Sequence, residues 1–260
     1  LEKVIEYMDE PHADTSNFPQ HLISEFASSK VKVALSGDGA DELFMGYGWY
    51  WKYDHTRKIV RIKNALFSNR FKEHLKNISI FSREERAGLW KNKSSLNNDF
   101  VGSNIKKINA FDLSTYLPGQ LLSKVDRTSM MHSLEVRCPF LDYKLAEYVY
   151  NLPTEYKMKN GKGKIILKEI LSEIMPKEFV HRKKQGFGAP IKEWLREEKM
   201  KIFVKESLNS SSPIYKYLKE EGVNKILRSF YEKENNEFCY KVWSLLCLSL
   251  WLKYHNKYHV

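Results

Sequence analysis

The sequence predicts an α/β fold in which the end of a partial parallel sheet is followed by a predominantly helical region. Residues 19–29 carry a helical apolar pattern and lead directly into a short run typical of a strand, "VKVAL" at 31–35. That run ends in the Gly-rich turn "SGDG", after which "ADELF" is again helical. This order of elements is typical of open α/β sheets, whose ligands bind beyond the carboxyl ends of the strands.

The first helix is predicted from Leu22, Ile23 and Phe26, which share one helical face, and from Pro19, which suits a first turn. After residue 53 strand signals fade and helical patterns dominate. The chain is therefore expected to divide into the end of the sheet region at 1–53, a variable helical insertion at 54–105 and a helical region at 106–260.

Three later segments have clear helical patterns. Residues 141–152 carry apolar side chains at helical spacing, with Asp142 near the start. Residues 161–176 repeat this design and are predicted to direct four side chains inward: Ile166, Ile170, Leu171 and Ile174. The run "VWSLLCLSLWL" at 242–252 is shorter than the roughly 18 apolar residues of a membrane span, so it predicts a buried helix.

Charge and cysteine content argue against several classes of protein. The 43 Lys and Arg exceed the 32 Asp and Glu and give a formal charge of +11. Much of the excess has helical spacing at 52–76, which favours a solvated helical face over nucleic-acid binding. Cys138, Cys239 and Cys247 lack the spacing of a disulfide framework or zinc site, and no secretory leader is recognisable. A cytoplasmic protein is expected, with no membrane contact.

The acidic turn "SGDGADE" at 36–42 has the composition of an anion site. Successive N–H groups at a Gly-rich turn form an electropositive nest, and Gly37 and Gly39 allow close approach of a ligand. Carboxylates beside a phosphate are tolerable when Mg²⁺ bridges them, and a free carboxylate could serve as a general base. Alternatively, Asp38 and Asp41 simply cap the turn and the helix that follows.

A lysine-bearing segment, "GKGKIILKEIL", provides a second chemical element. A lysine just before a helix, preceded by flexible glycines, can place its charge on a phosphate or a developing oxyanion. Taken by itself, such a lysine is more often a solvated side chain.

Four blocks in order resemble the synthetase domain of the glutamine-dependent asparagine synthetase family. They are "DEPHADTSNFPQHLISEFASSKVKVALSGDGADELFMGY", "YLPGQLLSKVDRTSMMHSLEVRCPFLD", "GKGKIILKEIL" and "HRKKQGFGAPIKEWL". The resemblance extends from about residue 6 to about 253, and it is weakest at 52–105. It implies the adenine nucleotide alpha hydrolase-like (ATP pyrophosphatase) fold.

The resemblance also implies an ATP-dependent amide ligase that uses Mg²⁺. ATP converts aspartate to an acyl-adenylate with release of pyrophosphate, and ammonia derived from glutamine then displaces AMP to give asparagine. A carboxylate needs this activation because oxide is a poor leaving group, and binding and charge stabilisation do most of the work.

The roles carried over from the family are assigned by position. Ser36, Gly37 and Gly39 match the nucleotide-binding turn, and Asp41 matches a carboxylate that holds Mg²⁺ on the pyrophosphate. Lys164 aligns with the catalytic lysine that stabilises adenylation, and Lys162 is a weaker candidate. Asp38 occupies the acidic position linked to deprotonating ammonia or orienting the intermediate, where many relatives carry the longer glutamate. The remaining candidates for contact with phosphate or substrate are Glu42, Arg182 and Lys184.

Two features of the family are not recognised in the 260 residues: the early nucleotide loop S-G-G-x-D-S and the glutaminase domain with its cysteine nucleophile. The expectation is that 1–260 form a single incomplete synthetase-type domain, inactive alone and prone to associate through exposed sheet edges and apolar surface. A homo-oligomer is also expected.

Two other functions remain open from the sequence. One is an amidotransferase of the same architecture that acts on another carboxylate, because the quoted blocks report adenylation and do not name the acid. The other is a non-catalytic, basic binding module that engages nucleic acid or a partner chain. Acidic residues at the turn, where a phosphate reader would place Lys or Arg, count against the second function.

Overall fold

The predicted strand forms as β1 (Val33–Leu35) and pairs in parallel with β2 (Glu135–Arg137). Val33 lies opposite Glu135 and Leu35 opposite Arg137. Parallel neighbours need a long crossover, and the chain between these strands supplies it mainly as helices. The computed structural model describes residues 1–50, 70–92, 105–182 and 186–255.

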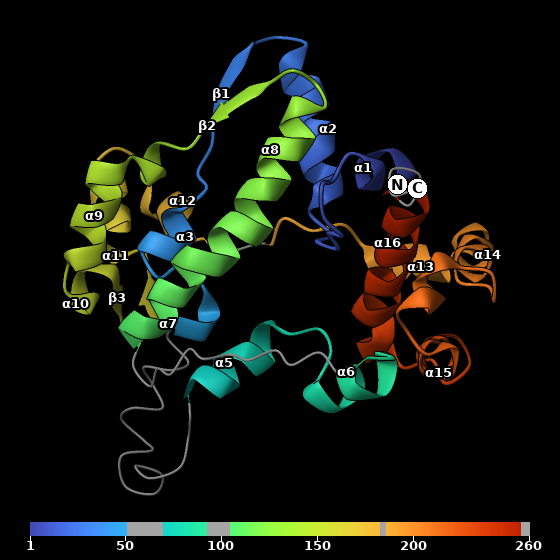
Figure 1. Cartoon of the computed structure of the whole chain (residues 1–260). Coiled ribbons are helices and arrows are strands. Elements are labelled where there is room, and N and C mark those ends of the chain that lie inside the picture. Colours follow the sequence, from blue (N-terminus) through green and yellow to red (C-terminus); the bar gives the residue numbers. More distant parts are fainter. Residues whose placement is uncertain (51–69, 93–104, 183–185, 256–260) are drawn as a thin grey trace, which may run out of the picture.

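Helices dominate these described parts of the chain, and the second sheet is a small antiparallel pair (Figure 1). Its strands are β3 (Met158–Lys159) and β4 (Lys162–Gly163). The coarse prediction of a small parallel sheet accompanied by a helical region is thereby supported.

Helix α2 (Asn17–Ser28) feeds β1 as predicted, but the apolar face expected on it does not enter the core. Leu22, Ile23 and Phe26 are 60%, 52% and 69% exposed, whereas Ser24 is buried. The reason is that α2 turns its opposite side toward α8 (Ser123–Met130), with which it runs side by side (Figure 1).

A continuous helical rod connects the lower part of the molecule to β2 (Figure 1). It consists of α7 (Ile105–Phe111), the π-helix η1 (Asp112–Leu122) and α8. Pro118 lies inside η1 and has no N–H to donate, so a regular α-helical ladder cannot continue through it. Wider π-helical turns result, and two of their side chains, Asp112 and Tyr116, contact aromatic residues at the site described below.

The last helix, α16 (Cys239–His255), forms the centre of the largest core cluster, which confirms the buried helix predicted at 242–252. Its buried side chains include Val242, Trp243, Leu246 and Leu250. The elements in contact with it are α1 (Glu2–Glu6), α13 (Ile191–Arg196), α14 (Glu198–Ser207), η3 (Pro213–Lys216), α15 (Glu220–Tyr231) and η4 (Asn236–Phe238). Among the described helices, none is long and apolar enough to cross a membrane.

A smaller core supports the acidic turn. Leu43 and Phe44, at the end of α3 (Ala40–Leu43), pack with Val149, Ile166 and Leu167. The other elements of this region are η2 (Pro139–Leu141), α9 (Tyr143–Asn151), α10 (Thr154–Lys157), α11 (Ile165–Ser172) and α12 (Lys177–Val180).

The helix expected within 141–152 is confirmed as α9, and Asp142 caps it by accepting hydrogen bonds from the N–H groups of Lys144 and Leu145. The inward orientation expected for Ile170 and Ile174 is wrong, since these side chains are 56% and 77% exposed. Only one side of the short helix α11 packs against α3 and its neighbours.

The helical insertion expected at 54–105 falls partly outside the described residues, as does most of the basic segment 52–76. Within it the structure describes α5 (Arg70–Ile78) and α6 (Arg83–Leu89). Helix α6 begins with a capping box, in which Ser82 and Glu85 each accept a backbone hydrogen bond from the other. The proposed domain boundaries stay a prediction.

Candidate active site

The turn after β1 is shaped by Gly39, the residue that precedes α3. Its φ of 88° lies in the left-handed region that residues with a side chain rarely adopt. A β-carbon at Gly39 would also lie 2.3 Å from Cδ2 of Leu141. The backbone conformation therefore favours glycine, and the nearby Leu141 side chain of η2 adds to this preference. A β-carbon at Gly37 would meet no atom within 4 Å, so the turn is open on that side.

Ser36 and Asp38 form a local hydrogen-bonded unit at the end of β1. The Ser36 N–H donates to the Arg137 carbonyl at 2.9 Å and so extends the pairing with β2. The Ser36 hydroxyl donates to Oδ2 of Asp38 at 2.6 Å and lies 3.4 Å from Sγ of Cys138. This contact orients the Asp38 carboxylate while leaving its other oxygen for a further interaction.

Lys164 is placed by an unusual backbone conformation at the start of α11. Its φ of 59° and ψ of 38° are left-handed, and its N–H donates to the Phe44 carbonyl at 2.9 Å. The preceding Gly163 lies against the same segment, because a β-carbon there would be 2.0 Å from the Met45 carbonyl oxygen. The hairpin β3–β4 thus docks directly onto the segment that follows α3.

This docking brings together two residues that the sequence assigns to phosphate chemistry. Nζ of Lys164 lies 3.1 Å from Oδ1 of Asp41, and the two side chains are 30% and 24% exposed. Asp41 therefore does not point into bulk solvent, and both groups remain reachable by a ligand. A cation and a carboxylate at this distance can share a polyanionic ligand, the cation by direct attraction and the carboxylate through a metal ion.

Further lysines surround this pair, and the sequence alone gave one of them no role. Burial and the charges of Lys164 and Lys162 lower the pKa of Lys168, while Asp41 acts in the opposite direction. The signal for Lys168 was its position one helical turn after Lys164. Positive charge concentrated at the start of α11 suits an anionic ligand.

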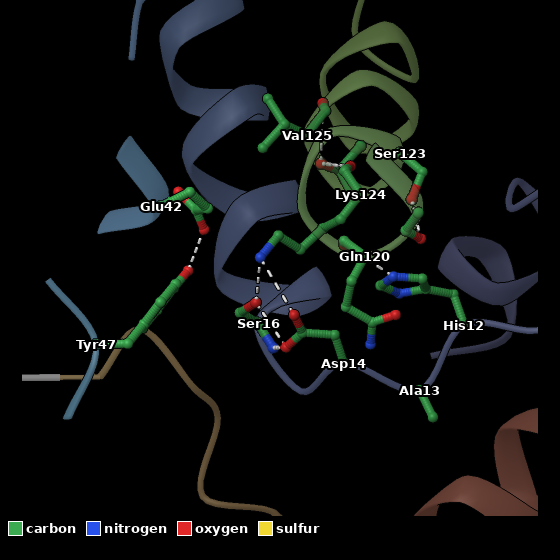
Figure 2. Close-up of polar contacts among 12 residues, drawn as sticks. His12, Ala13, Asp14, Ser16, Glu42, Tyr47, Gln120, Ser123, Lys124 and Val125 are labelled. Atoms are coloured by element: carbon green, nitrogen blue, oxygen red, sulfur yellow. Dashed lines mark hydrogen bonds and ion pairs between the residues drawn. The ribbon is translucent and has the colours of Figure 1, made fainter. Parts of the chain in front are cut away.

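Glu42 points away from solvent, with 1% of its surface exposed. Its carboxylate accepts a hydrogen bond from the Tyr47 hydroxyl (Figure 2). Its backbone carbonyl accepts from the side-chain amide of Asn109 in α7. Burial raises the pKa of the Glu42 carboxyl, and the neighbouring carboxylates of Asp41 and Asp38 add to this effect. This placement favours a role in holding the turn, and contact of Glu42 with phosphate or substrate stays a prediction.

Aromatic side chains line the inner side of the turn. Tyr47 stacks on Trp49 with ring centroids 4.2 Å apart, and Tyr116 of η1 meets both rings edge-on. Burial, followed by the negative charges of Asp14, Glu42, Asp112 and Asp41, raises the pKa of Tyr116 to about 12. Tyr116 therefore keeps its proton and can donate it in a hydrogen bond.

A second polar cluster lies near Glu42 and Tyr47 and joins the loop before α2 to α8 (Figure 2). Nζ of Lys124 donates to the Ser16 hydroxyl at 2.7 Å and lies 3.2 Å from Oδ2 of Asp14. His12 Nε2 lies 3.0 Å from the Gln120 carbonyl, and burial lowers the pKa of His12. Sequence reasoning quoted the blocks containing these residues without giving them a role, because their pairing exists only in space.

Arg182 and Lys184 are the last two residues predicted to contact phosphate or substrate. Arg182 is exposed, and its guanidinium lies over the Phe179 ring at 4.6 Å from the centroid. Lys184 lies outside the described residues. Both assignments stay predictions.

The donors at the turn fit a magnesium ion that is held mainly by its substrate. The described residues contain no group of three or more His, Cys, Asp or Glu side chains able to hold a metal. Mg²⁺ is often bound through one or two protein carboxylates together with substrate phosphates, and it prefers hard oxygen ligands. Asp41 offers one partly exposed carboxylate of this kind.

Comparison with known proteins identifies the family of the chain. The asparagine synthase family profile matches residues 1–253, which is nearly all of the sequence. The chain belongs to the asparagine synthase family. Family membership confirms the resemblance seen in the four sequence blocks.

Curated members of the family show how much of them this chain spans. It is 29% identical to asparagine synthetase [glutamine-hydrolyzing] 1 of Bacillus subtilis, over 96% of this chain and 45% of the relative. It is 33% identical to asparagine synthetase [glutamine-hydrolyzing] 3 of the same organism, over 63% of this chain and 29% of the relative. The chain thus spans less than half the length of these relatives.

Proposed function

We propose that the chain carries the synthetase chemistry of an ATP-dependent ligase that makes asparagine from aspartate. The observation that supports this proposal best is the ion pair between Lys164 and Asp41. The four synthetase blocks and the family assignment indicate the same reaction. We also propose that β1 and β2 belong to a sheet of the ATP pyrophosphatase type.

Lys164 supports the first half of the reaction. When the aspartate carboxylate attacks the α-phosphate of ATP, negative charge grows on the phosphate oxygens and the departing pyrophosphate. The Lys164 ammonium, fixed by the left-handed backbone and by Asp41, stabilises that charge without reorganising. Mg²⁺ bound through Asp41 would neutralise charge on the pyrophosphate when present.

Asp38 supports the second half of the reaction. An ammonium ion must lose a proton before nitrogen attacks the acyl-adenylate, and a carboxylate within reach can accept that proton. The Ser36 hydroxyl holds Oδ2 of Asp38, so Oδ1 is the oxygen we assign as the proton acceptor. The exposed turn around Gly37 leaves room for the acyl-adenylate beside it.

The two roles predict two different losses in a complete protein that contains this chain. Lys164→Ala should lower both isotope exchange between pyrophosphate and ATP and amide formation, each by about 10²–10³-fold. Asp38→Asn should lower amide formation by about 10²–10⁴-fold while exchange persists, because adenylation does not need the base. Aspartate-dependent exchange and asparagine production are the two measurements.

Lys159→Ala is the matched control for Lys164→Ala, since Lys159 is an exposed lysine in the same hairpin. It should leave both rates within about twofold, as expected for an exposed side chain to which no role in the reaction is assigned. Retained exchange in the Lys164 variant, or equal loss of both rates in the Asp38 variant, would contradict these assignments.

The acceptor acid is tested in the exchange assay, and the nitrogen source is tested by asparagine production with glutamine or ammonium. The relatives carry the name glutamine-hydrolysing, so we propose glutamine as the source of ammonia for the complete protein. Exchange measured with aspartate and with other carboxylates separates an asparagine synthetase from an amidotransferase acting on another acid.

A further inference from the structure

Gly46 lies directly behind the Lys164–Asp41 pair, and the space that a side chain would fill at this position is already taken. A β-carbon built on Gly46 would be 2.0 Å from Oδ1 of Asp41 and 2.4 Å from Cε of Lys164. Oδ1 is the oxygen that pairs with Nζ of Lys164, and Cε is the carbon that bears this nitrogen. The Gly46 N–H also donates to the Asp41 backbone carbonyl at 2.8 Å, which fixes the two residues relative to each other.

The backbone itself does not require glycine at this position. Among the described glycines, those with positive φ are Gly39 and Gly161. Alanine is therefore compatible with the backbone of residue 46. The atoms that a methyl group would strike belong to the ends of two partly exposed side chains, which can move aside without unfolding the protein.

Gly163 provides the opposite case a few ångströms away. A β-carbon there would meet the Met45 carbonyl oxygen at 2.0 Å and the Gly46 Cα at 3.0 Å. These are backbone atoms in a buried segment, so a side chain at Gly163 must separate the hairpin β3–β4 from the segment after α3. Gly163 therefore serves packing, whereas the three atoms nearest to a β-carbon at Gly46 all belong to the side chains of the ion pair.

We propose that Gly46 is a positioning residue for the ligase reaction, because its missing side chain allows Asp41 and Lys164 to meet. The catalytic consequence of this inference rests on the proposed function. The geometry from which we infer it is independent of that function. A methyl group at residue 46 displaces the ammonium and the carboxylate from each other and from the phosphates they serve. Displacement of a catalytic group by about 1 Å can cost roughly 10²-fold in rate.

The first test is Gly46→Ala in the complete protein that contains this chain. We expect kcat for aspartate-dependent pyrophosphate release to fall about 10²-fold, while KM for ATP stays within a few-fold. The melting temperature should fall by less than about 3 °C, since the clash involves only side-chain ends. Gly163→Ala should instead lower the melting temperature much more, because its clash involves backbone.

A second test does not depend on ligase activity. Limited acetylation of the 260-residue chain, followed by mass spectrometry of the Lys164 peptide, measures how freely the Lys164 amine reacts. Separation from Asp41 should raise the labelling rate of Lys164 several-fold in Gly46→Ala. Gly88→Ala is the matched control, because a β-carbon in that part of α6 meets no atom within 4 Å.

The outcomes separate this inference from the proposed function. An inactive complete wild-type protein would count against the ligase proposal, while faster labelling of Lys164 in Gly46→Ala would still support the positioning role. Unchanged labelling, an unchanged kcat in an active protein, or a loss of melting temperature as large as that of Gly163→Ala would each overturn the inference about Gly46.

Discussion

At the scale of single residues, the acidic turn divides its carboxylates between two environments. Asp38 and Asp41 remain partly exposed, where one is held by a hydroxyl and the other by a lysine. Glu42, one position further along α3, is buried and bonded to Tyr47. Three neighbouring acids thus differ in burial and in their partners, which is how one segment can supply both chemistry and support.

The burial of Glu42 predicts a specific dependence of stability on pH. Because burial raises the pKa of this carboxyl, the folded state holds its proton more tightly than the unfolded state does. The stability contributed at this site is therefore greatest below the ordinary carboxyl value of 4.5 and is lost as pH rises through the raised pKa. Glu42→Gln keeps an oxygen that accepts from Tyr47 but does not ionise.

Denaturant unfolding of Glu42→Gln and wild type across a pH series measures this effect. The two should have similar free energies of unfolding near the ordinary carboxyl pKa, and the variant should gain relative to wild type as pH rises. The exposed Glu147, changed to Gln, serves as control and should show no such trend. A difference that is constant with pH would show that Glu42 does not titrate in a buried site.

The part of the site that could be predicted from the sequence consists mainly of residues close together along the chain. Ser36, Asp38 and Asp41 sit in one turn whose composition indicates anion chemistry, and Lys164 was assigned through the family resemblance. The ion pair of Lys164 with Asp41, and the cluster of Asp14 with Lys124, arise from tertiary packing. Residue type and spacing hold no information about such pairs until the elements are placed.

At the scale of elements, the π-helix η1 ties the crossover to the segment after the turn through one buried carboxylate. Asp112 accepts hydrogen bonds from the Tyr50 hydroxyl at 2.6 Å and from the Trp49 ring N–H at 3.2 Å. Its other oxygen lies 2.7 Å from Nε2 of His74 in α5. Both His74 and Asp112 have fully buried side chains. One acid therefore joins η1, α5 and the aromatic side of the site.

Replacement of Asp112 by alanine should lower the free energy of unfolding by about 3–5 kcal/mol, because it leaves buried donors without their acceptor. Asp112→Asn should cost less, since its amide oxygen can still accept from Tyr50. Asp126→Ala is the control, because that carboxylate is 63% exposed, and it should change stability by less than about 0.5 kcal/mol. Urea unfolding gives all three values, and equal stability of the Asp112 and Asp126 variants would refute the network.

Helix positions were predicted well, but the direction of their faces was not. Helices α2, α9 and α16 form where apolar spacing, Asp142 and the long apolar run indicated them. The spacing of Phe26 in α2 and Ile170 in α11 indicated an apolar stripe, yet both are exposed. Periodicity reports that a stripe exists, whereas its burial depends on which element is available to cover it.

At the scale of the whole molecule, burial is distributed unevenly. The core around α16 is extensive, whereas the parallel pair β1–β2 at the other end of α2 has little cover (Figure 1). Leu35 and Val33 of β1 are 72% and 41% exposed, and Leu22, Ile23 and Phe26 of α2 add further exposed apolar surface. The formal net charge of +11 favours separate molecules, because like charges repel. The exposed apolar surface is therefore the feature that favours association.

This surface predicts that the 260-residue chain self-associates at micromolar concentrations, and that charges on α2 abolish the association. The double substitution Leu22→Glu with Phe26→Lys leaves the net charge unchanged and places an acid four residues before a base, an arrangement that stabilises helices slightly. Both side chains are exposed, so the fold should lose less than about 0.5 kcal/mol per site. Sedimentation velocity should show the variant at the monomer mass of 30.7 kDa.

The matched control is Ile170→Glu with Ile174→Lys, an equally spaced and equally charged change of exposed apolar side chains in α11 and just after its end. If the exposed apolar side of α2 drives association, this control remains associated while the α2 variant does not. Loss of association in both variants would indicate non-specific attraction between apolar side chains. A wild-type chain that stays monomeric would show that the exposed side of α2 is too small to hold two copies together.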